Sequence, residues 1–414
     1  MTGIQEPNFK PKTIWTGDNL PIMRGMNSAC VDLIYLDPPF NSKANYAAPI
    51  GSKAAGAEFK DTWTLDDIDD EWINSIAEQH PSLYQVILAA MTDSDKSYLA
   101  YMAQRLLEME RILKDTGSIY LHCDPTMSHS LKLVMDAIFG RKNFRNEIIW
   151  CYTGPGSPKM RQFNRKHDNI FWYSKGEIWT FNKEAARVPY KDPKQRPRKV
   201  FDTGGAFDME AIKEMRAKGK ILETWWDDIA LAVRSKKERT GYPTQKPLKL
   251  LKRIIEASSN KNDIVFDPFC GCATTLVAAE GLNHPRNWIG IDISPKAAEL
   301  VIDRIREARG MFEDIKARDD IPQRTDLGKL PSPRSHLEYL YGVQDACCKG
   351  CGEYQRKGNL EVDHIYPKSK GGTDHLSNLQ LLCGNCNSIK GNRSMEYLTL
   401  RRNQTKEILR MASW

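Results

Sequence analysis

Short apolar, β-branched runs alternate with helical patterns through most of this 414-residue chain, and this alternation restricts the fold more than any other feature. The expected strands cover residues 31–36, 118–123, 147–152, 168–173, 263–266 and 288–291. The expected helices cover residues 98–113, 127–139, 247–258, 274–280 and 295–309. Alternation of this kind predicts an α/β fold with a doubly wound sheet, in which ligands bind at the carboxyl ends of the strands.

The composition is that of a globular protein with a mild excess of positive charge. Hydrophobic residues make up 41% of the chain, yet no apolar stretch approaches the ~20 residues that span a bilayer. The first residues lack the basic and apolar regions of a secretory signal, so we expect a cytoplasmic protein with no membrane partner. Lys and Arg number 60 against 53 Asp and Glu, which suits a polyanionic partner but is also common among ordinary enzymes.

A tetrapeptide directly after the first expected strand has the groups needed to methylate an exocyclic amine. The residues Asp37-Pro38-Pro39-Phe40 follow the apolar run 31–36, where the end of a strand faces the ligand crevice. The amine is a poor nucleophile because its lone pair is delocalised into the base. Acceptance of its two N–H protons by the Asp37 carboxylate and the Pro38 carbonyl would free that lone pair. Phe40 could stack on a base rotated out of the duplex, so the tetrapeptide predicts methyl transfer without a metal.

A later strand–turn–helix segment predicts the site of the methyl donor. Residues 263–275 have the pattern of a strand, a tight turn and a helix, and the next expected strand leads to Asp292. An acid in that position commonly binds ribose hydroxyls. The turn has fewer glycines than a phosphate-binding loop, so a nucleoside cofactor fits better than a dinucleotide. A purely structural turn is the alternative that this segment alone leaves open.

Together these motifs make residues 1–310 similar to the amino-group DNA methyltransferases of the permuted β class, in which the catalytic motif precedes the S-adenosylmethionine motif. The matching segments are 16–20, 37–41, 122–124, 139–150, 242–247 and 263–275. The resemblance implies a Rossmann-like, S-adenosylmethionine-dependent sheet. It assigns catalysis to Asp37, Pro38, Pro39 and Phe40. It assigns binding of S-adenosyl-L-methionine to Asp18, Asp37, Lys246, Asp267, Phe269, Gly271, Thr275 and Asp292. The turn departs from the family at Cys272-Ala273, where Ser-Gly is common, and we expect small residues to be tolerated there.

The resemblance also implies a substrate. Double-stranded DNA is the expected partner, and the class suggests a homodimer. The Asp at the head of the catalytic motif resembles members that methylate adenine N6; cytosine N4 is the alternative, although those members more often carry Ser. Residues 155–240 are basic with interleaved aromatic residues and are expected to hold the target-recognition region. A solvated insertion is the other interpretation of this segment.

Four cysteines near the C-terminus predict a structural zinc site. Cys348 and Cys351 form one pair, Cys383 and Cys386 form another, and 31 residues separate the pairs. Paired spacing of this kind satisfies tetrahedral thiolate coordination of Zn²⁺ and, in a cytosolic chain, argues against disulfides. A module of about 80 residues has little core, so the metal is expected to supply folding energy.

Between the cysteine pairs the chain resembles the HNH endonucleases, with their ββα-metal fold, over residues 345–400. The resemblance makes His364 the general base that deprotonates water, with Asn378 orienting its imidazole. Asp363 and Asn387 are expected to bind a catalytic Mg²⁺ against the scissile phosphate. Asn387 replaces the last His of the family motif, and its amide oxygen still suits a hard cation.

These assignments divide the chain into a methyltransferase domain at 1–310, a linker at 311–335 and an HNH endonuclease domain at 336–414. Such a chain would methylate and cleave DNA as a single-chain restriction–modification enzyme. The alternative is a solitary or phage-type methyltransferase, acting on adenine N6 or cytosine N4, whose zinc module only binds DNA. A DNA-binding protein with both sites degenerate is disfavoured because Asp37 and His364 are present with their motif neighbours.

Overall fold

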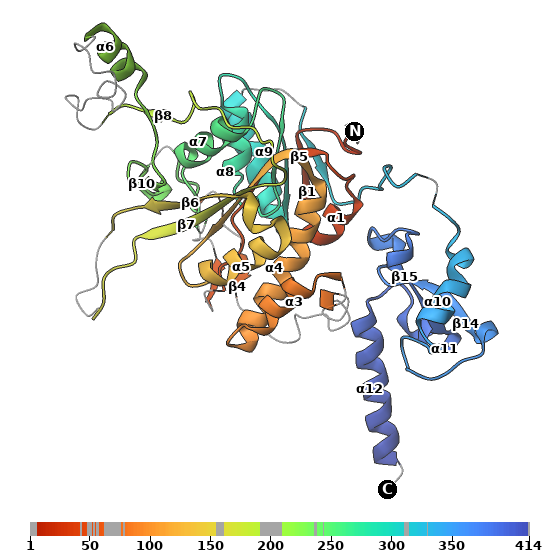
Figure 1. The fold of residues 1–414 in the computed structure, drawn as a ribbon. Coiled ribbons are helices and arrows are strands. Elements are labelled where there is room, and N and C mark those ends of the chain that lie inside the picture. Colours follow the sequence, from red (N-terminus) through yellow and green to blue (C-terminus); the bar gives the residue numbers. More distant parts are fainter. Residues whose placement is uncertain are drawn as a thin grey trace.

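The computed structural model confirms the α/β fold and the small C-terminal ββα module (Figure 1). The residues that it describes are 6–41, 44–47, 52, 54, 58–61, 76–77, 79–154, 161–190, 209–235, 238–242, 244–309, 314–328 and 330–412. None of the helices in this part of the chain combines the length and the apolar character that crossing a bilayer requires.

A nine-stranded sheet forms the centre of the large domain, in the order β10-β6-β7-β5-β2-β11-β12-β1-β13. The strand β7 runs antiparallel to both neighbours, and the other adjacent strands are parallel. The bounds are β1 (Thr13–Thr16), β2 (Val31–Leu36), β5 (Leu113–Cys123), β6 (Phe144–Cys151), β7 (His167–Ser174), β10 (Trp225–Trp226), β11 (Ile264–Asp267), β12 (Asn287–Asp292) and β13 (Lys316–Arg318). Every predicted strand is therefore present, and β1, β10 and β13 are additional.

Helices cover both faces of this sheet. Their bounds are α1 (Asn19–Gly25), α3 (Pro81–Leu88), α4 (Asp93–Ile112), α5 (Ser128–Phe139), α7 (Leu248–Ser258), α8 (Thr274–Glu280) and α9 (Pro295–Arg309). Ile14 and Leu33 pack on one face with α7, α8 and α9, whereas their chain neighbours Trp15 and Ile34 pack on the other with α1, α3, α4 and α5. Successive strand residues point to opposite faces, so apolar runs are what a sheet buried on both sides needs.

Smaller elements lie outside the central sheet. Their bounds are β3 (Ala44–Ala47), β4 (Glu58–Asp61), β8 (Arg187–Val188), α6 (Met209–Lys218) and β9 (Lys220–Ile221). The strands β3 and β4 form one hairpin, and β8 pairs antiparallel with β9. Figure 1 shows α6 at the far end of this second pair, away from the central sheet.

The carboxyl ends of three adjacent strands bring the acids of the predicted site together. The strand β2 ends one residue before Asp37, β11 ends at Asp267 and β12 ends at Asp292. These strands are parallel neighbours, so the three acids meet at one edge of the sheet. Gly271 and Ala273, with φ of 49° and 61°, turn the chain from β11 into α8.

The segment predicted as a linker, 311–335, is docked on the large domain over much of its described length. Residues 316–318 form β13, an edge strand parallel to β1. Further along, the N–H of Ser28 donates to the Asp326 carboxylate at 2.8 Å. This part of the segment therefore extends the large domain instead of forming a free tether.

The C-terminal module has a small core of its own. Its elements are α10 (Leu337–Val343), β14 (Leu360–His364), β15 (Leu379–Cys383), α11 (Gly384–Lys390) and α12 (Met395–Ala412). The antiparallel pair β14–β15 followed by α11 is the ββα unit that the resemblance implies. Its core includes Leu381, Leu382 and Leu398 together with Cys348 and Cys386. Few apolar side chains are buried among the described residues of this module, so we expect its stability to depend on the cysteine cluster.

Candidate active sites

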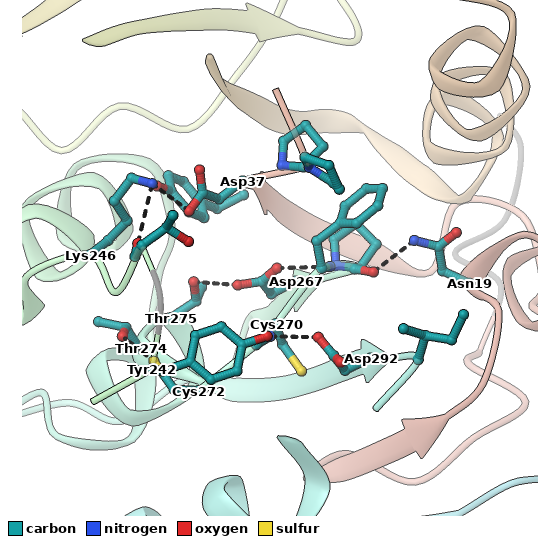
Figure 2. A pocket seen from close by; sticks show the side chains of 18 of the residues that line it. Asn19, Asp37, Tyr242, Lys246, Asp267, Cys270, Cys272, Thr274, Thr275 and Asp292 are labelled. Carbon is teal, nitrogen blue, oxygen red and sulfur yellow. Dashed lines mark hydrogen bonds and ion pairs between the residues drawn. The ribbon is translucent and has the colours of Figure 1, made fainter. Parts of the chain in front are cut away.

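A cavity of about 370 Å³ lies at the carboxyl edge of the central sheet. It is lined by every residue that the sequence assigned to methyl transfer: Asp18, Asp37, Pro38, Pro39, Phe40, Lys246, Asp267, Phe269, Gly271, Thr275 and Asp292. Figure 2 shows the carboxylates of Asp37, Asp267 and Asp292 in succession along the cavity. The fold therefore joins motifs that are far apart in the sequence.

One oxygen of Asp37 is held and the other is unpaired. Its Oδ2 accepts a hydrogen bond from the Lys246 ammonium at 2.6 Å, and the Lys246 side chain is only 8% exposed. Its Oδ1 is buried and, within the described part of the chain, has no hydrogen-bond partner. An unpaired buried acceptor costs roughly 1–3 kcal/mol. Oδ1 is therefore placed to accept an N–H from a bound molecule, while Lys246 neutralises and orients the carboxylate.

Asp267 lies deeper in the cavity, where two donors fix its carboxylate. The Thr275 hydroxyl donates to Oδ2 at 2.5 Å, and the Phe269 N–H donates to Oδ1 at 3.1 Å. Burial raises the pKa of Asp267 to about 7, with these two hydrogen bonds opposing the shift. The residue can therefore change charge near neutral pH, in response to whatever occupies the cavity.

Asp292 is fixed by backbone donors at the end of β12. The N–H of Gly271 donates to Oδ2 at 2.8 Å, and the N–H of Ser294 donates to Oδ1 at 2.9 Å. Burial raises the pKa of Asp292 above its ordinary value. Tyr242 also lines the cavity, and its ring lies 3.0 Å from where a Cβ on Gly271 would be. Tyr242 lies in the segment 242–247 that resembles the family, but the sequence analysis did not assign it to the site.

Arg105, on α4, also lines the cavity, and the sequence analysis did not identify it. Its Nη2 donates to Asp18 at 2.8 Å, and its Nε donates to the Asn19 side chain at 2.7 Å. Asn19 in turn donates to the Pro268 carbonyl at 2.8 Å. This series of hydrogen bonds links α1, α4 and the turn after β11 into one wall of the cavity. No local motif marks Arg105, because its partners come from distant segments.

Phe40 lies against the buried His122, which the sequence analysis included only in the segment 122–124 that resembles the family. The rings of Phe40 and His122 stack with centroids 6.1 Å apart and planes 20° apart. His122 bonds through Nδ1 to the Tyr35 hydroxyl at 2.8 Å and through Nε2 to Asp168 at 3.0 Å. Although burial opposes it, the hydrogen bond and charge of His122 hold the pKa of Asp168 below its ordinary value. This network fixes the Phe40 ring.

The predicted target-recognition region, 155–240, is only partly described, because 155–160, 191–208 and 236–237 lie outside the described residues. Described residues of the region line a second cavity, of about 970 Å³, with aromatic side chains that include Trp179 and Trp226. Recognition of a DNA sequence by this region stays a prediction.

The four cysteines of the C-terminal module converge on one point. The Sγ atoms of Cys348, Cys351, Cys383 and Cys386 all lie within 4.8 Å of one another. The N–H of Cys383 donates to Cys348 Sγ at 3.1 Å, and the Arg402 guanidinium donates to Cys386 Sγ at 3.0 Å. Donors aimed at sulfur stabilise thiolates, and four convergent thiolates fit the tetrahedral coordination of Zn²⁺.

His364 is bonded to a different partner from the one expected. Its Nε2 lies 2.7 Å from Asp374 Oδ1. Asn378, predicted to orient the imidazole, instead accepts the Tyr366 N–H at 2.9 Å and donates to the Thr373 carbonyl at 2.9 Å. The amide side chain is used up by the loop backbone, so the expected contact with the ring is replaced by one from Asp374.

The expected Mg²⁺ ligands lie at the ββα unit. Asp363 accepts through Oδ2 from the buried Lys390 ammonium and from the Gln380 amide, both at 2.9 Å. Asn387 donates to Glu361 at 2.5 Å. Glu361 and Asp363 are two residues apart on β14 and so share a face. Oxygen donors of this type fit a hard cation, although Lys390 already neutralises much of the Asp363 charge.

Comparison with known proteins follows this division of the chain. A protein-family model described as DNA methylase, of the N6/N4 type, matches residues 31–303, and one described as HNH endonuclease matches residues 348–393. The type II methyltransferase M.EcaI of Enterobacter cloacae is 28% identical over 380 residues, which covers 79% of this chain and 76% of that protein. The DNA adenine methyltransferase YhdJ of Escherichia coli K12 is 27% identical over 307 residues, covering 73% and 86%.

Among solved structures, the PvuII cytosine-N4-specific DNA methyltransferase aligns with 75% of this chain and 97% of its own, at 14% identity and a TM-score of 0.44. The methylase match alone spans more than half of the chain. The protein belongs to the N6/N4 family of DNA methylases and carries a C-terminal HNH endonuclease domain with a four-cysteine cluster.

Proposed function

We propose that this protein transfers a methyl group from S-adenosylmethionine to the N6 amine of a flipped adenine in double-stranded DNA. The observation that carries the proposal is the buried, unpaired Oδ1 of Asp37. This oxygen would accept one N–H of the amine, and the Pro38 carbonyl would accept the other, which leaves the nitrogen lone pair free to attack. Phe40, backed by His122, offers a fixed ring on which the flipped base can stack.

The cavity residues suit a nucleoside cofactor. S-adenosylmethionine, when bound, supplies an electrophilic methyl group. Asp292, held by two backbone N–H groups, offers a carboxylate to the ribose hydroxyls. Asp18 and Asp267 offer acceptors to the ammonium of the methionine part, and Arg105 offers the cation for its carboxylate. Gly271 leaves space for the cofactor beside the Tyr242 ring.

Adenine is preferred over cytosine because an Asp heads the catalytic motif, and because the relative YhdJ is named a DNA adenine methyltransferase. The test is mass spectrometry of nucleosides from plasmid DNA treated with the purified protein and S-adenosylmethionine. We expect N6-methyladenine. The appearance of N4-methylcytosine without N6-methyladenine would replace the adenine proposal with the cytosine one.

For the HNH domain we propose Mg²⁺-dependent cleavage of DNA, which makes the chain a single-chain restriction–modification enzyme. His364 would take a proton from the attacking water, and Asp363 and Asn387, with Glu361 beside them, would hold the cation. Support comes from the family match over 348–393 and from the carboxylate partner of His364. The alternative is that the domain only binds DNA.

An assay of cleavage on unmethylated and pre-methylated plasmid, with Mg²⁺, distinguishes a nuclease domain from a domain that only binds DNA. Discrete fragments from unmethylated DNA alone, lost in His364→Ala, support restriction–modification. Methyl incorporation without fragments from either plasmid leaves a methyltransferase with a DNA-binding appendage. A homodimer and a cytoplasmic location stay predictions, and light scattering coupled to gel filtration tests the first.

A further inference from the structure

We propose that Asp374 is the positioning residue of the nuclease histidine, and that the methyltransferase domain holds Asp374 in place through a contact between Arg24 and Tyr366. This inference rests on the nuclease function proposed for the HNH domain. It concerns residues 366–374, here called the nuclease loop, which connect β14 to the turn before β15.

The geometry defines how Asp374 acts on His364. The Nε2 of His364 lies 2.7 Å from Asp374 Oδ1, and the two side chains are 20% and 26% exposed. The Lys368 ammonium approaches the other oxygen of Asp374 at 2.9 Å. Burial opposes ionisation, but Lys368 and His364 together hold the pKa of Asp374 below its ordinary value. An ionised carboxylate only accepts, so Nε2 carries the proton and Nδ1 is the basic nitrogen of the neutral ring.

The nuclease loop is closed from inside the HNH domain. The Asn378 amide accepts the Tyr366 N–H at 2.9 Å and donates to the carbonyls of Tyr366 and Thr373 at 3.0 and 2.9 Å. A Cβ added at Gly372 would lie 1.8 Å from the Tyr366 carbonyl oxygen, so no larger residue fits this closure. The loop is therefore a tight ring that presents Asp374 at a fixed place.

The same loop is held from outside by the methyltransferase domain. The Arg24 guanidinium, at the end of α1, lies 3.9 Å from the centroid of the Tyr366 ring. Gly371 has a φ of 87°, and a Cβ there would lie 2.9 Å from the Pro21 carbonyl oxygen and 2.8 Å from the Ile321 side chain. Close backbone approach and a cation over an aromatic face together fix the loop against α1. The nuclease histidine is thus oriented by a loop that two domains share.

The first arm of the test compares the full-length protein with Asp374→Ala and Asp374→Asn. We measure kcat and KM for plasmid cleavage, methyl incorporation, and the ¹H and ¹⁵N resonances of the His364 ring in histidine-labelled protein. Loss of the carboxylate should lower the kcat for cleavage about 10- to 100-fold and leave KM and methylation unchanged. Asn restores little, because its NH₂ can face Nε2 and allow the other tautomer. The Nε2–H resonance should lie far downfield in the native protein, because that proton is bonded to the Asp374 carboxylate, and should lose this downfield shift in both variants.

The second arm tests the contribution of the methyltransferase domain. Tyr366→Leu removes the ring over which Arg24 lies, whereas Tyr366→Phe keeps it. We expect Leu to lower cleavage and to disturb the His364 resonances in the same sense as Asp374→Ala, and Phe to leave both unchanged. Tyr339→Leu is the matched control, because Tyr339 is 58% exposed in the same domain. Equal effects of Tyr366→Leu and Tyr339→Leu would overturn the interdomain part.

The outcomes separate the failure of this inference from the failure of the nuclease proposal. If the native protein methylates DNA but cuts none, the nuclease proposal fails, and the His364 resonances decide the positioning role. A downfield Nε2–H resonance that persists in Asp374→Ala overturns that role. If the native protein cuts DNA and Asp374→Ala cuts equally fast, the role is overturned whatever the resonances show.

Discussion

The cavity at the carboxyl edge of the central sheet and the HNH site differ in what holds their side chains in place. The cavity lies at the ends of strands in a nine-stranded sheet that is buried on both faces, and backbone N–H groups hold Asp267 and Asp292. The HNH site lies on a two-stranded hairpin with a small core that includes two of the four clustered cysteines. A large core can position catalytic groups by itself. We expect a small core to depend on a bound metal and on contacts with a neighbouring domain.

Removal of zinc should unfold the HNH domain and leave the methyltransferase domain folded. Cys383→Ser, or a strong chelator, should unfold the ββα unit, because structural zinc contributes on the order of 10 kcal/mol to modules of this size. Methyl transfer should persist, since the cavity belongs to the other core. Hydrogen exchange of β14 and β15 reports the folding of the HNH domain, and methyl incorporation reports the activity of the methyltransferase domain.

The control for that experiment is Cys347→Ser, which alters the neighbouring cysteine that lies outside the cluster. It should leave exchange in β14 and β15 unchanged. Retained protection of these strands after loss of Cys383 and zinc would show that the small core is stable without the metal, which would contradict this prediction.

Lys246→Met should impair methyl transfer alone. Loss of the ammonium leaves Asp37 Oδ2 without its partner at 2.6 Å, so both orientation and charge balance are disturbed. We expect the single-turnover rate of methylation to fall about 100-fold, with DNA cleavage unaffected. Lys249→Met, at a side chain 59% exposed on α7, is the matched control. Equal rates in the two variants would remove Lys246 from the site.

Asp267 should give the cofactor-free protein a characteristic dependence of stability on pH. Its pKa is raised to about 7 by burial, above the value of roughly 3.9 in an unfolded chain. The stabilisation due to the protonated form is complete below about pH 4 and is lost as pH rises through about 7, by roughly 1–4 kcal/mol. Denaturant unfolding at pH 5 and pH 8 should show this loss in the native sequence and a smaller one in Asp267→Asn. The same change in the free energy of unfolding between pH 5 and pH 8 in both proteins would contradict this prediction.

Gly271→Ala is expected to have the smallest of these effects. A Cβ there would approach the Tyr242 ring at 3.0 Å on a residue with φ of 49°, and would occupy space beside the cofactor. We expect S-adenosylmethionine to bind about 10-fold more weakly by calorimetry, corresponding to ~1.4 kcal/mol. Gly358→Ala, where an added Cβ meets nothing within 4 Å, is the matched control and should bind normally.

The strand pattern was sufficient to place Asp37 and Asp292 at the ligand edge, because each follows an apolar strand, whereas other cavity residues such as Lys246 were assigned through the family resemblance. It was insufficient for the residues that orient them. Arg105 and His122 act through partners on other strands and helices, and nothing near them in sequence marks these contacts. The polar segment 316–318 became an edge strand because its backbone pairs with β1. Asp374 replaced Asn378 at His364 because loop closure consumes the Asn378 amide.

We propose that Asp37 activates the target amine independently of the nuclease site. The most direct measurement is transfer of a labelled methyl group to plasmid DNA by the native protein, Asp37→Ala and His364→Ala. We expect a loss of at least about 1,000-fold in Asp37→Ala, equivalent to ~4 kcal/mol, and native rates in His364→Ala. Native rates in Asp37→Ala, or an equal loss in His364→Ala, would contradict it.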